Sequence, residues 1–319
     1  MLSLNYSNFE FRIPNFELKS PMTENTTKNI EELVVFSGQY DDCAENSRVV
    51  IPEGIEEIGE NAFREFSCLT EVVLPRSLKR ISACAFAGCM NLKRVEMQFG
   101  LEEILDEAFS SCSSLTSVNI PDSVKRIGEG CFEACASLSQ IKLSESVIMI
   151  GSGAFAYCFN LCDVTIPDSC VLVEFNAFAN CFNLEGVKLS CNMGLIDEST
   201  FEGCRSLKYV DLPGKLVKIG RRAFKGCSSL ASIILPVSTA VIGFDAFADC
   251  VSLKRIAIPK DLREIEDQEA FGGCDSLSEI SFGGSRERWE SIMRGSILTV
   301  QKSDCSVATP KISFMNLED

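Results

Sequence analysis

The residues of this sequence with the most evident capacity for chemistry are its 17 cysteines. Paired cysteines would form a disulfide framework. However, equivalent side chains on successive turns of a repeat point in parallel about 5 Å apart, whereas a disulfide needs facing Cβ atoms about 3.8 Å apart. We therefore expect a ladder of free, buried thiols that donate weakly to backbone carbonyls between turns. The ladder consists of ten cysteines at one repeat position: Cys43, Cys89, Cys112, Cys135, Cys158, Cys181, Cys204, Cys227, Cys250 and Cys274.

The other cysteines lie off this ladder. They are Cys68, Cys84, Cys131, Cys162, Cys170, Cys191 and Cys305. Cys131 and Cys170 fall at core positions, while we expect Cys68, Cys162 and Cys305 to be exposed, which favours a reducing compartment. Because no two cysteines have the Cys-x-x-Cys spacing and the sequence contains no histidine, no metal centre is expected.

The missing histidine also restricts catalysis, since triads of the Ser-His-Asp and Cys-His types cannot form. No phosphate-binding loop, dinucleotide-binding glycine motif or nucleophile elbow is present. Carboxylates are plentiful, but they fall at solvent-facing repeat positions with no visible pairing across a cleft. We therefore expect a protein that is not an enzyme and that has no cofactor.

Composition narrows the class of partner. The chain has 319 residues, is 46% hydrophobic and carries a formal charge of -15. Binding to nucleic acid or to an anionic membrane would need a basic face, so neither is expected. The first twenty residues lack the charged and apolar regions of a signal peptide, and no apolar run reaches 18 residues. We expect a cytoplasmic protein without membrane insertion, with export by another route as the alternative.

The cysteine ladder follows from an internal repeat. An aromatic recurs at intervals of 23 residues, at Phe63, Phe86, Phe109, Phe132, Phe155, Phe178, Phe201, Phe224 and Phe247. Phe271 comes next after 24 residues, and Tyr40 lies 23 residues before Phe63. Ten clear units and one degenerate unit result, and such a fixed period is typical of solenoids.

Each unit predicts the same elements. A small residue, the aromatic, the cysteine and a leucine lie at helical spacing, which indicates one helical turn packed inward. An alternating apolar pair such as Val118 and Ile120, closed by Pro121, indicates a short strand. A second apolar pair such as Val124 and Ile127 indicates a second short extended segment.

We therefore predict an α/β-type repeat solenoid of about 11 rungs of 23 residues, because no unit can cover its own apolar face and stacking buries all of them together. Residues 33–282 would form the solenoid, and residues 1–32 an N-terminal segment or cap. Residues 283–319 would form a C-terminal cap, in which Ser285, Trp289, Ile292 and Met293 make an amphipathic turn or two and Ile312 and Phe314 a last strand.

The units VNIPDSVKRIGEGCFEACASL and IILPVSTAVIGFDAFADCVSL resemble the BspA-type leucine-rich repeat over residues 40–282. The tail ISFGGSRERWESIMRGSIL is similar to the closing segment of bacterial members, with Trp289 in a short capping helix. That family is associated with surface adhesion, host-protein binding and immune recognition. The resemblance implies a leucine-rich repeat stack that binds rather than catalyses, and it specifies no ligand.

Candidate binding residues are found where the repeat changes character. The two residues between the inward positions of the second pair are expected to face solvent. In the early units they carry alternating charge pairs such as Glu56-Glu57 and Lys79-Arg80, which would pair across rungs. From the fifth clear rung they become apolar, and the turn face of the same rungs gains aromatics. The predicted partner-binding residues are Ile148, Met149, Tyr157, Phe159, Val171, Leu172, Phe182, Leu195, Val217 and Val241.

Exposed apolar patches of this kind are typical of partner sites. Packing over neighbouring rungs, or against the N-terminal segment, is the alternative interpretation. The outward face of the longer strands is a second candidate surface. Its residues, such as Asp163, Lys188 and Tyr209, show no dominant chemistry and would suit a broad, polar ligand or simply solvent.

Two functions follow from the sequence. The first is a non-catalytic scaffold that binds a protein partner through one face of the repeat. The second is a microbial surface adhesin that binds a host matrix protein or carbohydrate. Self-association remains open in both cases.

Overall fold

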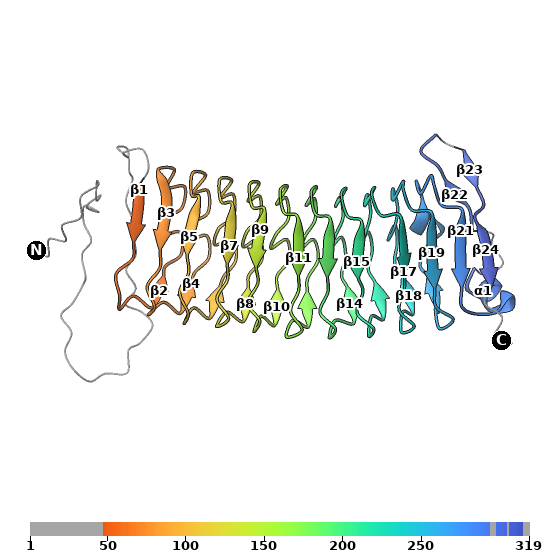
Figure 1. The fold of residues 1–319 in the computed structure, drawn as a ribbon, viewed down its shortest axis with the longest axis horizontal. Coiled ribbons are helices and arrows are strands. Elements are labelled where there is room, and N and C mark those ends of the chain that lie inside the picture. Colours follow the sequence, from red (N-terminus) through yellow and green to blue (C-terminus); the bar gives the residue numbers. More distant parts are fainter. Residues whose placement is uncertain (1–46, 294–297, 305, 315–319) are drawn as a thin grey trace, which may run out of the picture.

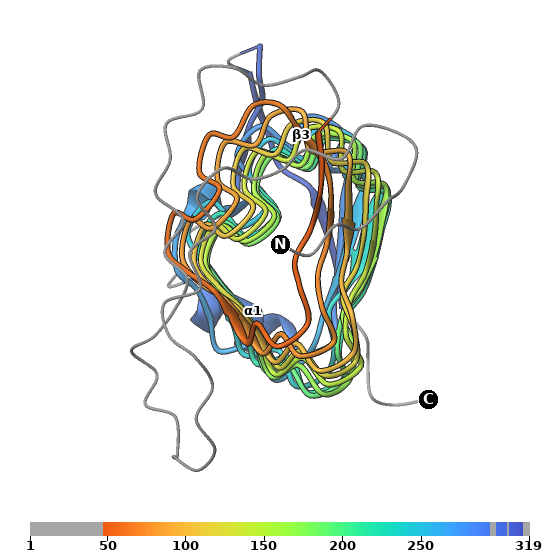
Figure 2. The same ribbon diagram turned by 90° about the vertical axis from the view of Figure 1, so that its left-hand side faces the viewer.

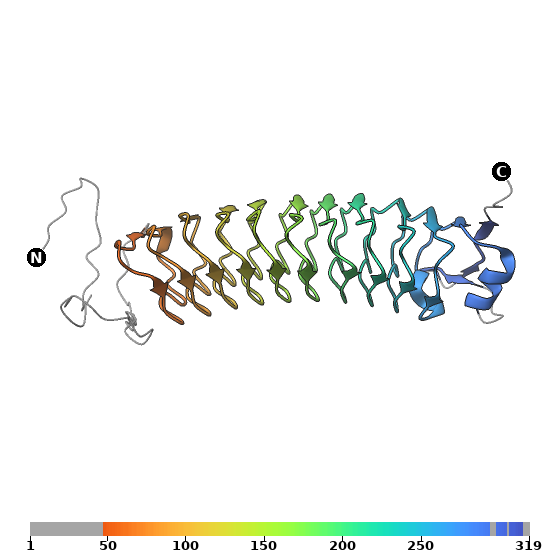
Figure 3. The same ribbon diagram turned by 90° about the horizontal axis from the view of Figure 1, so that it is seen from below.

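The computed structural model describes residues 47–293, 298–304 and 306–314, which form a long solenoid of stacked rungs (Figures 1 and 3). Viewed along the stack, successive rungs superpose around a shared interior (Figure 2). This confirms a solenoid with a unit of about 23 residues. The predicted rung at Tyr40, the ladder thiol Cys43, the N-terminal segment and Cys305 lie outside the described residues.

The first strands of the rungs lie side by side along the stack and pair in parallel within four sheets. These strands form the sheets β1-β3-β5, β7-β9, β11-β13-β15 and β17-β19-β21-β24. Their bounds are β1 Ser47–Val50, β3 Leu69–Val73, β5 Arg94–Glu96, β7 Ser117–Asn119, β9 Gln140–Lys142, β11 Asp163–Thr165, β13 Gly186–Lys188, β15 Tyr209–Asp211, β17 Ser232–Ile234, β19 Arg255–Ile258, β21 Glu279–Phe282 and β24 Lys311–Phe314.

The second extended segment of each rung is a two-residue strand. These strands also pair in parallel, in the sheets β2-β4-β6-β8-β10-β12 and β14-β16-β18-β20. Their bounds are β2 Glu57–Ile58, β4 Arg80–Ile81, β6 Glu103–Ile104, β8 Arg126–Ile127, β10 Met149–Ile150, β12 Leu172–Val173, β14 Leu195–Ile196, β16 Lys218–Ile219, β18 Val241–Ile242 and β20 Glu264–Ile265.

The repeating phenylalanines form the centre of the core. From Phe63 to Phe271, successive rings stack with centroids 5.0 to 5.7 Å apart and with ring planes within 13° of parallel. Parallel pairing of successive rungs brings equivalent side chains to about the strand spacing, so a residue type repeated every 23 residues becomes a column. Burial of these rings and of the leucines beside them is the main stabilising contribution.

The cysteine ladder forms a second buried column, and its described thiols are free. Each Sγ donates to the carbonyl of the repeating phenylalanine one rung earlier; Cys158, for example, donates to Phe132 O at 3.2 Å. Burial raises the pKa of the Cys135 and Cys204 thiols to about 12. The prediction of an unlinked ladder bonded to carbonyls is therefore confirmed for these residues. Cys68 differs from expectation, since it is half-buried and disulfide-bonded.

The predicted helical turn within each rung is wrong. Along the described part of the chain, the helices are the 3-10 helix η1 Gln268–Phe271 and the α-helix α1 Arg286–Ile292. In a regular rung, two residues four positions apart have positive φ, such as Cys84 at 55° and Gly88 at 73°. Left-handed residues at this interval prevent a right-handed helix from continuing.

Hydrogen bonding in this segment has two directions. Ala85 N and Ala87 N close reverse turns within the rung by donating to Ser82 O and Cys84 O. Phe86 N, between them, donates at 2.8 Å to Ala108 O of the next rung. Alternate amides therefore bond within the rung and between rungs, as a stacked turn requires and a helix does not allow.

The irregular unit and the last rung close the described solenoid. η1 accommodates the extra residue between Phe247 and Phe271. Helix α1 begins after Ser285, whose side chain accepts a hydrogen bond from Arg288 N, and it buries Trp289 against Phe282 with ring centroids 5.2 Å apart. β24 pairs with β21 and so provides the final strand. The Trp289 helix and the strand containing Ile312 and Phe314 are thus present as predicted.

Candidate functional site

The row of charges predicted on the early rungs exists on the two-residue strands. Cross-strand register aligns Glu57, Arg80, Glu103 and Arg126. Arg80 forms ion pairs with Glu57 at 3.6 Å and with Glu103 at 2.9 Å. Arg126 instead pairs with Asp106, at 3.8 Å. The alternating signs therefore pair across rungs for the first three members of the row.

The same register continues into apolar residues. Arg126 aligns with Met149, and Met149 aligns with Leu172. The prediction that both residues of each pair face solvent is only half right. The first residue is exposed, with 49% of Ile148, 55% of Val171 and 49% of Val217 accessible. The second residue, at Met149, Leu172, Leu195 and Val241, is half-buried. We call these seven residues the apolar stripe.

The turn aromatics form a compact cluster. Tyr157 meets Phe159 edge-on with centroids 6.3 Å apart, and Phe159 stacks on Phe182 at 4.9 Å. The guanidinium of Arg205 lies over the Phe182 ring, 4.5 Å from its centroid. Tyr157 has φ of 61°, a conformation that is rare for bulky residues. We call Tyr157, Phe159 and Phe182 the aromatic cluster.

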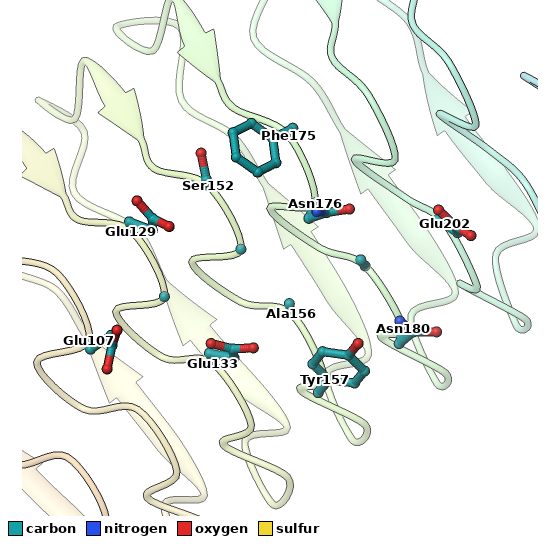
Figure 4. Close-up of a pocket in the computed structure, with 13 residues that line it drawn as sticks. Glu107, Glu129, Glu133, Ser152, Ala156, Tyr157, Phe175, Asn176, Asn180 and Glu202 are labelled. Atoms are coloured by element: carbon teal, nitrogen blue, oxygen red, sulfur yellow. The ribbon is translucent and has the colours of Figure 1, made fainter. Parts of the chain in front are cut away.

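Between the apolar stripe and the aromatic cluster runs a groove of about 360 Å³ that sequence analysis did not predict. Figure 4 shows Glu129, Ser152 and Phe175 along one wall, with Glu133 and Tyr157 on the opposite side. Five successive rungs contribute to it, from the rung of Glu107 to the rung of Glu202. Thirteen residues line it: Glu107, Glu129, Gly130, Glu133, Ser152, Gly153, Ala156, Tyr157, Phe175, Asn176, Ala179, Asn180 and Glu202.

The backbone explains the shape of this groove. In every regular rung the floor residue has positive φ, as at Gly130 with 55° and Gly153 with 60°. The left-handed conformation reverses the chain, so residues on either side of the floor stand on opposite walls. Two of the central rungs have glycine at the floor, Gly130 and Gly153, and the next has Asn176. Ala156 and Ala179 stand at the wall, and the small volume of these glycines and alanines leaves the groove open. The glycines at these two units are the sequence signal that could have located it.

The groove is acidic. Glu107, Glu129, Glu133 and Glu202 line it, and among its described lining residues there is no lysine or arginine. Burial raises the pKa of the Glu133 carboxyl, and the neighbouring charges of Glu107 and Glu129 raise it further. The groove therefore holds unbalanced negative charge in a partly desolvated setting, which favours a cationic ligand.

The outward face of the longer strands is the other surface predicted from the sequence. Tyr209 and Ile234 are its most exposed large residues. The Tyr209 hydroxyl donates to Asp163 Oδ1 at 3.2 Å, so this tyrosine is held against its own sheet. No cluster of three or more metal-ligating side chains is found in the described residues. The helices described for this chain are too short or too polar to cross a bilayer.

The sequence matches a known family of repeat proteins. Six copies of the BspA type leucine rich repeat region match, over residues 34–147, 102–230 and 194–295. A solved Treponema pallidum leucine rich repeat protein is 31% identical, covering 57% of this chain and 77% of its own length, with a TM-score of 0.44. No significant match to a curated protein was found.

Two further solved structures are similar. A leucine rich cell surface protein from Faecalibacterium prausnitzii is 26% identical and covers 78% of this chain and 91% of its own, with a TM-score of 0.41. A leucine-rich repeat protein from Bacteroides ovatus is 24% identical and covers 84% and 92%, with a TM-score of 0.46. The repeat copies span more than half of the sequence, so the chain belongs to the BspA-type leucine-rich repeat family.

Proposed function

We propose that this chain is a non-catalytic interaction scaffold that binds a protein partner through its central rungs. The apolar stripe, the groove and the aromatic cluster would act together as the binding surface. They lie on consecutive parts of the same rungs, since Met149 precedes Ser152 of the groove wall by three residues and Tyr157 belongs to both the groove and the cluster. The rest of the solenoid would hold this surface rigid.

The observation that carries the proposal is the clustering of Tyr157, Phe159 and Phe182 on the turn face. Aromatic residues are enriched at the cores of protein interfaces, where they bury large area at low conformational cost. Here two of them remain exposed, although the same fold buries every repeating phenylalanine from Phe86 to Phe271. Ile148, Val171 and Val217 add exposed apolar surface beside them.

The proposal is tested by partner capture with charged variants. Met149→Glu, Leu172→Glu and Leu195→Glu, combined in one protein, should abolish capture of a partner identified by quantitative mass spectrometry. The matched control carries Ser117→Glu, Asn119→Glu and Thr165→Glu on the strand face, where these side chains are exposed. Circular dichroism must show that both proteins fold. Equal capture by the two variants would contradict the proposal.

A surface adhesin for a host matrix protein or carbohydrate is the second candidate. It is favoured by one observation, the exposed rings of Tyr157 and Phe159, since aromatic rings pack against the apolar face of a sugar. Glycan-array binding that is lost in a Phe159→Ala, Phe182→Ala protein, but unchanged in the stripe variant, would support this candidate over the first.

The compartment is part of the same proposal. The exposed cysteines Cys162 and Cys191 are free, which supports a reducing compartment such as the cytoplasm. The disulfide at Cys68 supports the alternative, export to the cell surface or to a host. Cell fractionation, combined with counting of free thiols in the native protein, distinguishes the two.

A further inference from the structure

We propose that the central groove binds lysine or arginine side chains of an extended basic segment in the protein partner. The inference rests on the proposed function and specifies the chemistry of the ligand. It depends on a comparison between the groove and the equivalent positions farther along the same solenoid.

Farther toward the C-terminus, the positions that line the groove are filled by the chain itself. Arg222 occupies the floor position of Gly153, and Lys225 occupies the wall position of Ala156, each three rungs on. Lys225 Nζ lies 2.9 Å from Asp245 Oδ2, and Arg222 Nε lies 3.5 Å from the same oxygen. Burial alone would raise the pKa of Asp245, but these two cations hold it below its usual value. This backbone therefore accommodates cationic side chains ion-paired to a carboxylate.

In the central rungs the chain supplies the carboxylates without the cations. Glu107, Glu129 and Glu133 line the same end of the groove, and the charges of Glu107 and Glu129 add to burial in raising the pKa of Glu133. Gly153 has no side chain at the floor position where Arg222 stands in the later rung, and at Gly130 the side chains of Glu107 and Glu133 lie over the glycine instead. A cationic side chain from a partner would pair with these carboxylates here, as Arg222 and Lys225 pair with Asp245.

The walls favour a side chain over a bare ion. The cavity of about 360 Å³ is far larger than a metal ion requires, and Tyr157 and Phe175 present exposed rings to it. The methylene stem of lysine or arginine packs on such apolar surface while its charged end reaches carboxylates. A cation over an aromatic ring already occurs on the same side of the solenoid, where Arg205 lies 4.5 Å from the centroid of Phe182.

The spacing of the carboxylates suggests the length of the ligand. Glu133 and Glu202 hold the same wall position three rungs apart, which corresponds to about 15 Å at the spacing of parallel strands. An extended chain covers this distance in about five residues. A segment with two basic residues about five positions apart, lying along the stack, would reach both carboxylates.

The test is calorimetric titration of the full chain with a synthetic peptide. The probe is a capped peptide of alanine and serine with two lysines five positions apart, and the comparison peptide has both lysines acetylated. We expect saturable binding of the lysine peptide, weakening at least tenfold between low and high salt, and no binding of the acetylated peptide. Because a seated cation lowers the pKa of Glu133, binding should also release protons at an acidic pH where this carboxyl is still partly protonated, seen as a dependence of the heat on the buffer.

A matched pair of variants assigns the binding to the groove. Glu129→Gln with Glu133→Gln should weaken the lysine peptide tenfold or more. Glu102→Gln with Glu145→Gln removes the same charge from exposed residues outside the groove and should leave binding unchanged. If both variants bind the lysine peptide equally weakly, the attraction is a general one to an acidic protein and the inference is overturned. The inference is also overturned if the lysine peptide does not bind, or if the acetylated peptide binds equally well. If partner capture still depends on the apolar stripe, the proposed function survives that result.

Discussion

The hydroxyl of Tyr209 donates a hydrogen bond to Asp163 Oδ1 at 3.2 Å, across 46 residues of sequence. The two residues hold equivalent positions on β15 and β11, and β13 lies between them. The side chain of Tyr209 can cross β13 because Gly186 stands there, and a Cβ at Gly186 would collide with the tyrosine ring. A single glycine on the strand face therefore allows an aromatic to bridge three rungs.

This contact predicts a shifted titration of Tyr209. The hydrogen bond to Asp163, followed by the charge of that carboxylate, raises the pKa of the Tyr209 phenol. Asp163→Asn removes the charge, so the pKa of Tyr209 should fall toward its usual value of about 10. Ultraviolet difference titration of the wild type and the variant measures the change, with Tyr209→Phe identifying the transition. An unchanged titration would mean that the bridge is absent in solution.

The role of Gly186 can be tested separately. In Gly186→Ala the new methyl group takes the space of the Tyr209 ring, which is exposed and able to rotate away. The fold should persist, while the pKa of Tyr209 falls as it does in Asp163→Asn. A titration identical to that of the wild type would show that the ring does not lie across the glycine.

Removal of one repeating phenylalanine should be costly. Phe155 is fully buried and stacks between Phe132 and Phe178, so Phe155→Ala leaves a cavity in the ring column. We expect a loss of roughly 3–5 kcal/mol in the free energy of unfolding, measured by urea denaturation. Phe175→Ala is the control: this ring is 48% exposed, and its removal should cost about 0.5 kcal/mol or less. Comparable losses at both positions would contradict the assignment of the core.

Thiol reactivity should separate the exposed cysteines from the ladder. Burial raises the pKa of Cys135 and Cys204 to about 12, so little thiolate is present at neutral pH and access is blocked. Alkylation of the native protein should label Cys162 and Cys191, which are exposed. Ladder thiols should react only after unfolding, as peptide mass spectrometry would show. Rapid labelling of Cys135 in the native state would refute a buried ladder.

Removal of the Glu133 charge should increase the stability of the protein to an extent that depends on pH. The folded-state pKa of Glu133 is raised above its usual value, so its ionisation opposes folding as pH rises through that folded pKa. Glu133→Gln should therefore stabilise the protein at neutral pH, by roughly 0.5 kcal/mol or less. The gain should disappear in acid, below both the folded and unfolded pKa values of Glu133. Urea denaturation at several pH values, with Glu102→Gln as control, measures it; a gain that persists in acid would point to another cause.

The repeat period was enough to predict most of the architecture. A residue type that recurs every 23 positions must form a column once successive units pair in parallel. This accounts for the stacking of Phe132 on Phe155 and for the unlinked thiols of Cys135 and Cys158. The ion pairs of Arg80 and the break in the charged row at Met149 were visible for the same reason. In such a stack, residues at the same position of consecutive units lie next to each other on adjacent rungs, so an alignment of the units shows which side chains meet.

Local backbone conformation was not predictable in the same way. Helical spacing of the small residue, phenylalanine and cysteine suggested a helix, but the positive φ at Cys84 and Glu107, neither of which is glycine, replaces it with a stacked turn. The hydrogen bonds that Phe86 and its equivalents make to the next rung compensate for that conformation. Such bonds exist only in the assembled stack, so a single unit gives no sign of them.

The sequence by itself determined the period, the columns of the core and the rungs at which the surface changes. The tertiary structure decided which surface residues face one another. The left-handed turn at Gly153 places Ser152 and Ala156 on opposite walls, and stacking adds Glu129, Glu133 and Phe175 from adjacent rungs. The groove arises because a reversal within each rung is repeated at the spacing of paired strands, and a linear pattern of residue types does not encode that reversal.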